Sequence, residues 1–338
     1  MNQCPTEVSY VASPEGYTFI LHILTCLEIP VHLLGAYCIL FKTPRRMHSV
    51  KWLILNLHFW SALEDIYTSL VFTPFVLFPV MSGWGLGFEF YPVIGIYLFV
   101  TFLAAVASAI VLIYENRSFV LFIQNKSHFW CRHRLKFLVV NNVLVLFYFS
   151  PPYLTIPEQK KAVDIINRSV DCLMHITFLN RKQYVLTMDH SLVFWCLVIV
   201  LFIFTSQIVA LTIHLAYNLL TRTTTSISQQ TQKMQRNLVF ALAVQTTVPI
   251  MVIVVPVHVI LYSIHFWDYN QTRNNLIFIA LSVHGLISTF VMIFIHKPYR
   301  RFVLSPIYYV LDAVKERRNR NEQRIWNVKQ PNASTSRN

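Results

Sequence analysis

The residues of this chain that could do chemistry are three carboxylates set within long apolar runs. Glu28 lies in a run at 18–41, and Glu64 and Asp65 lie in a second run at 49–80. A charge at the bilayer centre costs about 2.5–3.5 kcal/mol on insertion scales, so such groups pair or take up a proton inside a helix bundle. Two interpretations fit them equally: a polar switch or ion site, or hydrogen-bonded core carboxyls that fix helix packing.

Successive residues of a helix point about 100° apart, so neighbouring carboxylates cannot share one face. We therefore expect at most one of Glu64 and Asp65 to face the bundle axis, with the other nearer an interface or a flanking helix. Polar side chains in the other runs are candidate partners that hold helices together; they are Asn56, Asn141, Asn142, Ser282, His284 and Ser288.

The other chemically capable residues form no catalytic or metal-binding pattern. The sequence has no HExxH, no GxSxG and no phosphate-binding glycine loop, and its 6 cysteines include no CxxC. His58 and Asp65, seven residues apart, are a weak signal on their own. We expect no enzyme activity, no metal and no cofactor. An internal repeat, which would favour a transporter, is also not seen in the sequence.

The composition indicates that these residues are positioned by membrane-spanning helices. Hydrophobic residues make up 55% of the 338 and charged residues 13%, against about 25% charged in soluble domains. Apolar runs without strict alternation must be helices in lipid. The predicted fold is an all-α membrane protein, a seven-transmembrane helix bundle, with runs at 18–41, 49–80, 91–114, 135–156, 191–220, 238–265 and 274–296.

Positive charge sets the orientation of this bundle. Of the 28 Lys and Arg residues, the connections on one side hold only Lys160, Lys161, Arg168, Arg181, Lys182 and Arg273. The other side carries the excess of Lys and Arg, which marks the cytoplasmic side of a membrane protein. Residues 1–17 are expected outside, 18–296 form the bundle and 297–338 form a cytoplasmic tail. The net charge of +13 is distributed as membrane topology requires and does not form a basic surface for nucleic-acid binding, so no nucleic-acid partner is expected.

The sixth run, 238–265, is the part of the bundle best suited to move. Pro249 and Pro256 each remove a backbone donor and crowd the preceding turn, so the helix should be kinked. A basic, glutamine-rich segment at 226–237 leads into it from the cytoplasmic side. We expect a helix that can swing at one end.

The outer segments offer sites for covalent modification. Cys4 and Cys172 both lie outside, where a disulfide would tie the N-terminus to the long 4–5 connection; two free thiols are the alternative. Asn167 and Asn270 each begin an Asn-x-Ser/Thr sequon on the same side and are candidate glycosylation sites.

The cytoplasmic tail should form a short amphipathic helix. Ser305 and Pro306 supply a cap and a first-turn proline, and apolar residues follow at helical spacing before a basic cluster. We expect this helix to lie in the inner membrane interface against anionic lipid, with polar, disordered residues after about 321.

Motifs along nearly the whole chain match a known receptor family. The chain resembles the nematode serpentine receptors of class H, which are chemosensory G-protein-coupled receptors. The matching stretches are Tyr37-Cys-Ile-Leu-Phe-Lys-Thr-Pro44, Met47-His-Ser-Val-Lys-Trp-Leu-Ile-Leu-Asn-Leu-His58, Tyr114-Glu-Asn-Arg117, Cys172-Leu, the pattern Thr231, Gln235, Ala241-Leu242, Gln245 and Pro249, then Ser282-Val-His-Gly285, Ser288-Thr289 and His296-Lys-Pro-Tyr-Arg300.

The resemblance implies a signalling switch at the inner ends of the third, sixth and seventh spans. Arg117 would lock to a neighbour at rest and release toward a G protein, by analogy with the Asp-Arg-Tyr of rhodopsin-like receptors. No cysteine begins the third span, so a bond between Cys4 and Cys172 would replace the usual outer disulfide. The switch residues are Glu115, Asn116, Arg117, Gln245, Pro249, Pro256, His296, Pro298, Tyr299 and Arg300.

The resulting hypothesis is a chemosensory receptor in the plasma membrane, with the sensory cilium as the compartment to examine. A small-molecule ligand would bind in the outer half of the bundle, and a heterotrimeric G protein would meet the inner loops. The rival is a polytopic transporter or channel that depends on Glu28 or Asp65. A third interpretation is a receptor-shaped homologue that no longer signals.

Overall fold

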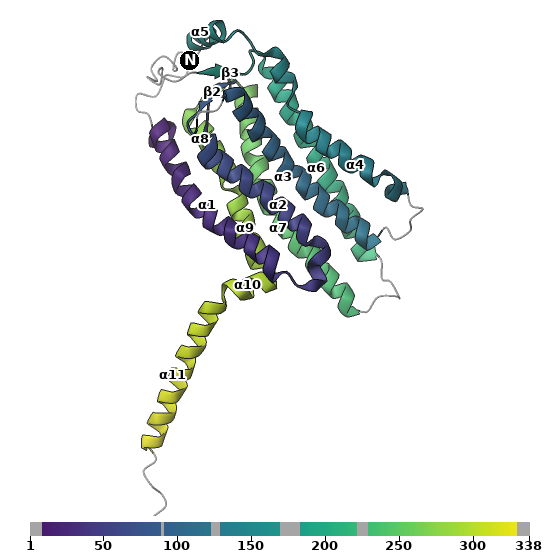
Figure 1. Ribbon diagram of the computed structural model, residues 1–338, viewed down its shortest axis with the longest axis vertical. Coiled ribbons are helices and arrows are strands. Elements are labelled where there is room, and N and C mark those ends of the chain that lie inside the picture. The colour runs from purple at the N-terminus through teal and green to yellow at the C-terminus, as the bar shows by residue number, and fades with distance from the viewer. Residues whose placement is uncertain (1–8, 89–90, 123–128, 170–182, 222–228, 330–338) are drawn as a thin grey trace, which may run out of the picture.

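The computed structural model describes residues 9–88, 91–122, 129–169, 183–221 and 229–329 of the chain. Long helices run side by side along one axis, with a small sheet at one end and a helical tail at the other (Figure 1). The bundle helices are α1 (Pro14–Lys42), α2 (His48–Ile66), α3 (Pro92–Phe122), α4 (Phe129–Phe147), α6 (His190–Thr221), α7 (Gln229–His265), α8 (Gln271–Ser282) and α9 (His284–Ile295).

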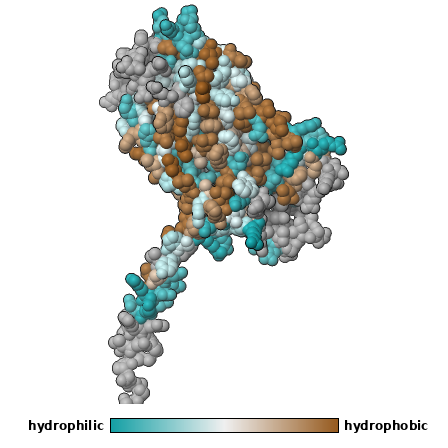
Figure 2. Space-filling model, viewed as in Figure 1, coloured by the Kyte–Doolittle hydropathy of each residue, from teal (hydrophilic) through white to brown (hydrophobic). Residues whose placement is uncertain are grey.

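The described helices confirm the predicted seven-helix membrane architecture. Six helical segments are long and apolar enough to cross a bilayer, the fifth of them being 239–265 and the sixth spanning α8 and α9 together. The helix outside that set is α2, whose 19 residues include Lys51, Glu64 and Asp65. Apolar side chains cover the flank of the bundle and hydrophilic ones gather toward its ends (Figure 2).

Helix α1 begins and packs where its sequence directs. The Ser13 side chain accepts a hydrogen bond from the Gly16 backbone N–H at 3.1 Å, and Pro14 occupies the first turn. Farther along, Gly35 faces α2 and α9 so closely that a Cβ there would lie 2.7 Å from atoms of both His58 and Thr289. Small residues permit this approach of helix backbones in membranes.

The second apolar run does not continue as a helix to residue 80, so that expectation is wrong. A π-helical turn (Tyr67–Val71) ends α2, and β1 (Pro74–Val76) follows, paired antiparallel with β2 (Ser82–Gly85). Pro74 and Pro79 explain the change, since proline lacks the N–H that a helix interior needs and restricts the residue before it. Strand β3 (Tyr184–Val185) pairs with the other edge of β2.

The sheet closes the outer end of the bundle through side-chain hydrogen bonds. The Tyr17 hydroxyl donates to the Pro74 carbonyl at 3.0 Å, and the Asn274 amide donates to the Phe78 carbonyl at 3.1 Å. Helix α5 (Gln159–Ser169) joins from the 4–5 connection, where the Gln159 side chain bonds both backbone groups of Val185. The hairpin is therefore tied to the first and seventh spans.

Among the described residues the interior of the bundle has three apolar clusters, and a polar layer separates two of them. The outer cluster includes Tyr17, Leu21 and Phe278, and the inner cluster includes Cys38, Ile54 and Ile110. Buried titratable side chains occupy the positions along α1, α2 and α9 that separate the two clusters; they are Glu28, His32, His58, Glu64, Asp65 and His284.

The prediction of a short amphipathic helix in the cytoplasmic tail is correct only in part. A helix starts at Ser305 as expected, but α11 (Ser305–Lys329) is 25 residues long and includes the residues after 321 that were expected to be disordered. It points away from the bundle along the long axis of the molecule instead of lying across the bundle's inner end (Figure 1). The short helix α10 (Lys297–Val303) connects it to α9 and buries Tyr299.

Candidate functional site

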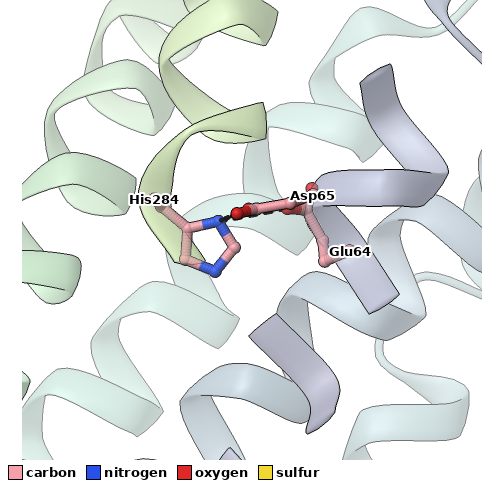
Figure 3. Close-up of side chains that lie close together, drawn as sticks. All are labelled: Glu64, Asp65 and His284. Carbon is pink, nitrogen blue, oxygen red and sulfur yellow. Dashed lines mark ion pairs between the residues drawn. The ribbon is translucent and has the colours of Figure 1, made fainter. Parts of the chain in front are cut away.

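The polar layer is centred on His284, which meets both carboxylates of α2. Its Nδ1 lies 2.8 Å from Asp65 Oδ1 and 3.1 Å from Glu64 Oε2, and none of the three side chains is exposed. Figure 3 shows the imidazole facing the carboxylates across the gap between α9 and α2. The prediction that only one of Glu64 and Asp65 would point inward is wrong, because α1, α3 and α9 enclose α2 on several faces.

These three residues have the side-chain types of a metal site, but their hydrogen bonds favour a proton. Their possible ligand atoms lie within 4.8 Å of one another. Nδ1 of His284 also lies 2.7 Å from the Leu281 carbonyl oxygen, a contact that requires an N–H on that nitrogen. The Leu281 carbonyl can only accept, so Nδ1 carries the proton and is not a metal ligand in this arrangement, while Nε2 of the same ring is buried with no hydrogen-bond partner among the described residues.

Asp65 also caps the inner half of the seventh span. That span breaks at Val283, and the first turn of α9 presents free backbone N–H groups to the carboxylate. Asp65 Oδ1 accepts from Gly285 at 3.0 Å and Oδ2 accepts from Leu286 at 2.7 Å. A helix N-terminus favours negative charge, so the break and the carboxylate stabilise each other.

His32, which the sequence did not single out, and His58, noted there only as a weak signal with Asp65, extend the layer to α1. His32 Nε2 lies 3.2 Å from Asp65 Oδ2, and His58 Nε2 lies 3.0 Å from the His32 carbonyl oxygen. The Thr289 hydroxyl lies 3.3 Å from His32 Nδ1 and 3.4 Å from His58 Nδ1. The spacing of Glu28 and His32, one helical turn apart, was the signal available in the sequence.

Glu28 occupies the outer edge of the same layer. The Ser69 hydroxyl donates to Glu28 Oε2 at 2.8 Å, and the Thr25 hydroxyl donates to Ser69 at 2.8 Å. The bonds run from α1 to the π-helical turn that ends α2. The predicted carboxylates thus meet hydroxyls and imidazoles from α1, α2 and α9.

Three of the other expected polar partners donate hydrogen bonds within their own helices. Asn141 and Asn142 donate to the carbonyls of Phe137 and Leu138, one turn back on α4. The Ser282 hydroxyl donates to Ile279. Of that set, His284 is the side chain that meets the buried carboxylates.

A second cluster lies at the inner end of α3. Glu115 is fully buried and is held by Arg134 of α4 through N–O distances of 2.9, 3.0 and 3.1 Å. The same guanidinium donates to Asn116 at 3.0 Å, and the Trp130 indole donates to Glu115 at 3.0 Å. Sequence reasoning missed Arg134, because no spacing relates it to Glu115 across the connection between the two helices.

Arg117 stands beside this cluster without joining it. Only 4% of the residue is exposed, and its Nε and Nη2 atoms are buried with no hydrogen-bond partner among the described residues. Burying part of a guanidinium without partners is costly. Arg117 is therefore held in an unsatisfied position at the cytoplasmic end of the third span.

The expected switch residues of the sixth and seventh spans meet near this end. His296 Nε2 and Gln245 Oε1 are 3.0 Å apart, and the hydroxyls of Tyr114 and Thr246 are 2.7 Å apart. These two contacts join α7 to the end of α9 and to α3. Both Pro249 and Pro256 lie inside α7, which runs unbroken from Gln229 to His265.

The exit of the seventh span is fixed by Tyr299 and its neighbours. The Tyr299 hydroxyl lies 2.7 Å from the Thr43 hydroxyl at the end of α1. Pro298 lies in the first turn of α10, and Arg300 donates to the Phe294 carbonyl at 2.9 Å. The motif thus connects the seventh span to the first.

The predicted outer sites are only partly within the described residues. Cys4 and Cys172 both lie outside them, so their disulfide stays a prediction. Asn167 belongs to helix α5. Asn270 is exposed and caps α8, its side-chain oxygen accepting from the Arg273 backbone N–H at 3.0 Å.

A cavity of about 100 Å³ lies beneath the hairpin in the outer half of the bundle. Its lining is mostly apolar and comes from the hairpin and from α3, α6, α7 and α8. Val257 and Ile260 are the α7 residues that line it. The sixth span therefore borders the cavity with its outer half, and its inner half makes the side-chain contacts with α3 and with the end of α9.

Comparison with known proteins covers the whole of the helix bundle. A family described as "Serpentine type 7TM GPCR chemoreceptor Srh" has a model that matches residues 12–309, from the start of α1 into α11. "Serpentine receptor class H-72" of Caenorhabditis elegans is 27% identical over 312 residues, which are 90% of this chain and 89% of that protein.

Proposed function

The chain belongs to the Srh family of serpentine seven-transmembrane chemoreceptors, and we propose that it binds a small-molecule cue in the outer half of the bundle and signals to a heterotrimeric G protein. The family is one of receptors, not of enzymes, and the resemblance seen in the sequence is confirmed. The chain is a multi-pass membrane protein. The plasma membrane, and the sensory cilium within it, are the compartments that we propose.

The observation that carries this proposal is that α7 both borders the outer cavity and contacts α3 nearer the cytoplasm. Val257 borders the outer cavity, while Thr246, eleven residues toward the cytoplasm, contacts Tyr114 of α3. At ~1.5 Å per residue the two positions are about 16 Å apart along the helix axis. Pro249 and Pro256 lie between them, at points where a helix bends.

A cue can shift this receptor only if it binds two arrangements of α7 with different affinity. An occupant of the cavity touches Val257 and Ile260, so its shape sets the position of the outer half of α7. The inner half is restrained by the contacts of Gln245 with His296 and of Thr246 with Tyr114. Release of these contacts would open the cytoplasmic end beside Arg117.

The test is a G-protein reporter assay in cells that express the full chain at their surface. Screening volatile and water-soluble cues should find at least one that raises the signal. Tyr114→Phe and Thr246→Val each remove one hydroxyl of the same contact, so each should change the basal signal, and the double variant should change it no further. A fully additive double variant, or no response to any cue from surface-localised protein, would contradict the proposal.

The rival transporter hypothesis depends on carboxylates that this structure uses internally. Asp65 accepts from two backbone N–H groups of α9, and Glu28 accepts from Ser69. These bonds support a structural role. Substrate flux that Asp65→Asn abolishes, without any G-protein dependence, would favour the rival instead.

A further inference from the structure

The side chains that line the cavity beneath the hairpin limit the chemistry of a ligand that could bind there. Three of its lining side chains have polar atoms other than sulfur: Ser82, Trp84 and Tyr148. The Tyr148 hydroxyl already donates to the Val100 carbonyl at 3.0 Å, and the Ser82 hydroxyl already accepts from Gln183 at 2.8 Å. None of the described residues that line the cavity is charged.

Trp84 differs from the other two because its polar atom has no hydrogen-bond partner in the described part of the chain. The residue is 9% exposed, its ring stacks on Phe75 with 5.0 Å between centroids, and Nε1 is buried without a hydrogen bond to any residue that the structure describes. Strand β2 holds it in place through pairing of Phe75 with Trp84 in the hairpin. A buried indole N–H usually finds an acceptor, and leaving it unpaired costs free energy.

We propose that the cue is a small apolar molecule with one hydrogen-bond acceptor, such as a ketone, aldehyde or ester, that accepts from Trp84 Nε1. This inference rests on the proposed function for its biological meaning, but the binding itself can be measured without signalling. The indole is a donor only, so the matching group on the ligand must be an acceptor. A further polar group or a charge would be buried without a partner.

The size of the cavity limits the size of the occupant. An apolar cavity of about 150 Å³ in another protein stays dry and binds benzene. The cavity here is smaller, at about 100 Å³. It therefore fits an occupant of about six heavy atoms or fewer, a size at which 2-pentanone and its hydrocarbon isostere 2-methyl-1-pentene form a matched pair.

The experiment compares these two probes on the full-length receptor in lipid nanodiscs. Binding is titrated by saturation-transfer NMR, with empty nanodiscs measured in parallel to subtract partition into lipid. A neutral hydrogen bond corresponds to about three- to tenfold in affinity. The wild-type receptor should therefore bind 2-pentanone about three- to tenfold more tightly than 2-methyl-1-pentene, and equal affinity would overturn the inference.

Trp84→Phe keeps the ring and removes the N–H, so it should reduce the ratio to about one while leaving alkene binding unchanged. Trp195→Phe is the matched control, because Trp195 is exposed on the outer surface of α6, and it should keep the wild-type ratio. A ratio that survives in Trp84→Phe would overturn the inference. The wild-type comparison needs no variant, so poor folding of Trp84→Phe leaves the test intact.

The outcomes separate this inference from the proposed function. Selective binding of 2-pentanone with no reporter response to any cue would support the inference and contradict the function. A cue that drives the reporter but does not compete with 2-pentanone would support the function and contradict the inference.

Discussion

The carboxylate of Asp65 accepts a hydrogen bond from the backbone N–H of Gly285 at 3.0 Å, so a side chain of the second span caps a helix that begins halfway through the seventh. The contact needs glycine, because a Cβ on residue 285 would lie 2.6 Å from Asp65 Oδ2. The break at Val283, the glycine and the carboxylate therefore form one structural unit in the middle of the bundle.

Removing this cap should destabilise the receptor. Asp65→Ala leaves the N–H groups of Gly285 and Leu286 unpaired and the His284 imidazole without one of its carboxylates, and breaking such a buried interaction costs about 3 kcal/mol or more. We expect a lower thermal midpoint in the purified receptor and reduced surface expression. Glu316→Ala removes an exposed carboxylate of α11 and should change neither; equal effects of the two variants would contradict the cap.

The pair of Glu115 and Arg134 should hold the inner ends of α3 and α4 together. Arg134→Ala would leave a fully buried carboxylate without its counter-ion, which costs about 3–5 kcal/mol. Flow cytometry of tagged receptor should show a clear loss of surface protein. Arg132→Ala, two residues away and exposed, is the control; if both variants reach the surface at the wild-type level, the pair does not stabilise the fold.

Arg117 should matter for signalling more than for folding. Its Nε and Nη2 atoms have no partner in the described part of the chain, so Arg117→Ala gives up no hydrogen bond from them. We expect near-normal surface expression and a cue response lowered several-fold in the reporter assay. Arg301→Ala, exposed on α10, should respond like wild type. Unchanged signalling in Arg117→Ala would remove this residue from the switch.

Glycosylation of Asn270 can be tested without disturbing the cap of α8. Thr272→Ala destroys the sequon but keeps the Asn270 side chain that accepts from the Arg273 N–H. Loss of one glycosidase-sensitive shift on a gel, with unchanged stability, is the expected result. A wild-type chain with no such shift at Asn270 would show that this segment is not modified or does not face the lumen.

The helices were predictable because an apolar run of about 20 residues has few alternatives in a bilayer. The hairpin was missed because hydropathy alone extended the second run through Pro74 and Pro79. The two prolines, with the glycines at 83, 85 and 87, were the local signals for turns and strands.

The site was predictable in its carboxylates but not in its connections. A buried acid must have a partner, and this identified Glu28, Glu64 and Asp65 from sequence alone. Which partners it meets depends on helix rotation and on the break at Val283, and neither is encoded by spacing within one run. His32 and Arg134 were missed for this reason.

The proposed receptor function depends on the chain crossing the membrane seven times with its basic connections in the cytosol. Epitope tags at the two termini of the full-length receptor, stained on intact and on permeabilised cells, test this most directly. The N-terminal tag should be accessible on intact cells and the C-terminal tag only after permeabilisation. Both tags accessible from the same face would contradict the seven-span topology and with it the proposed receptor function.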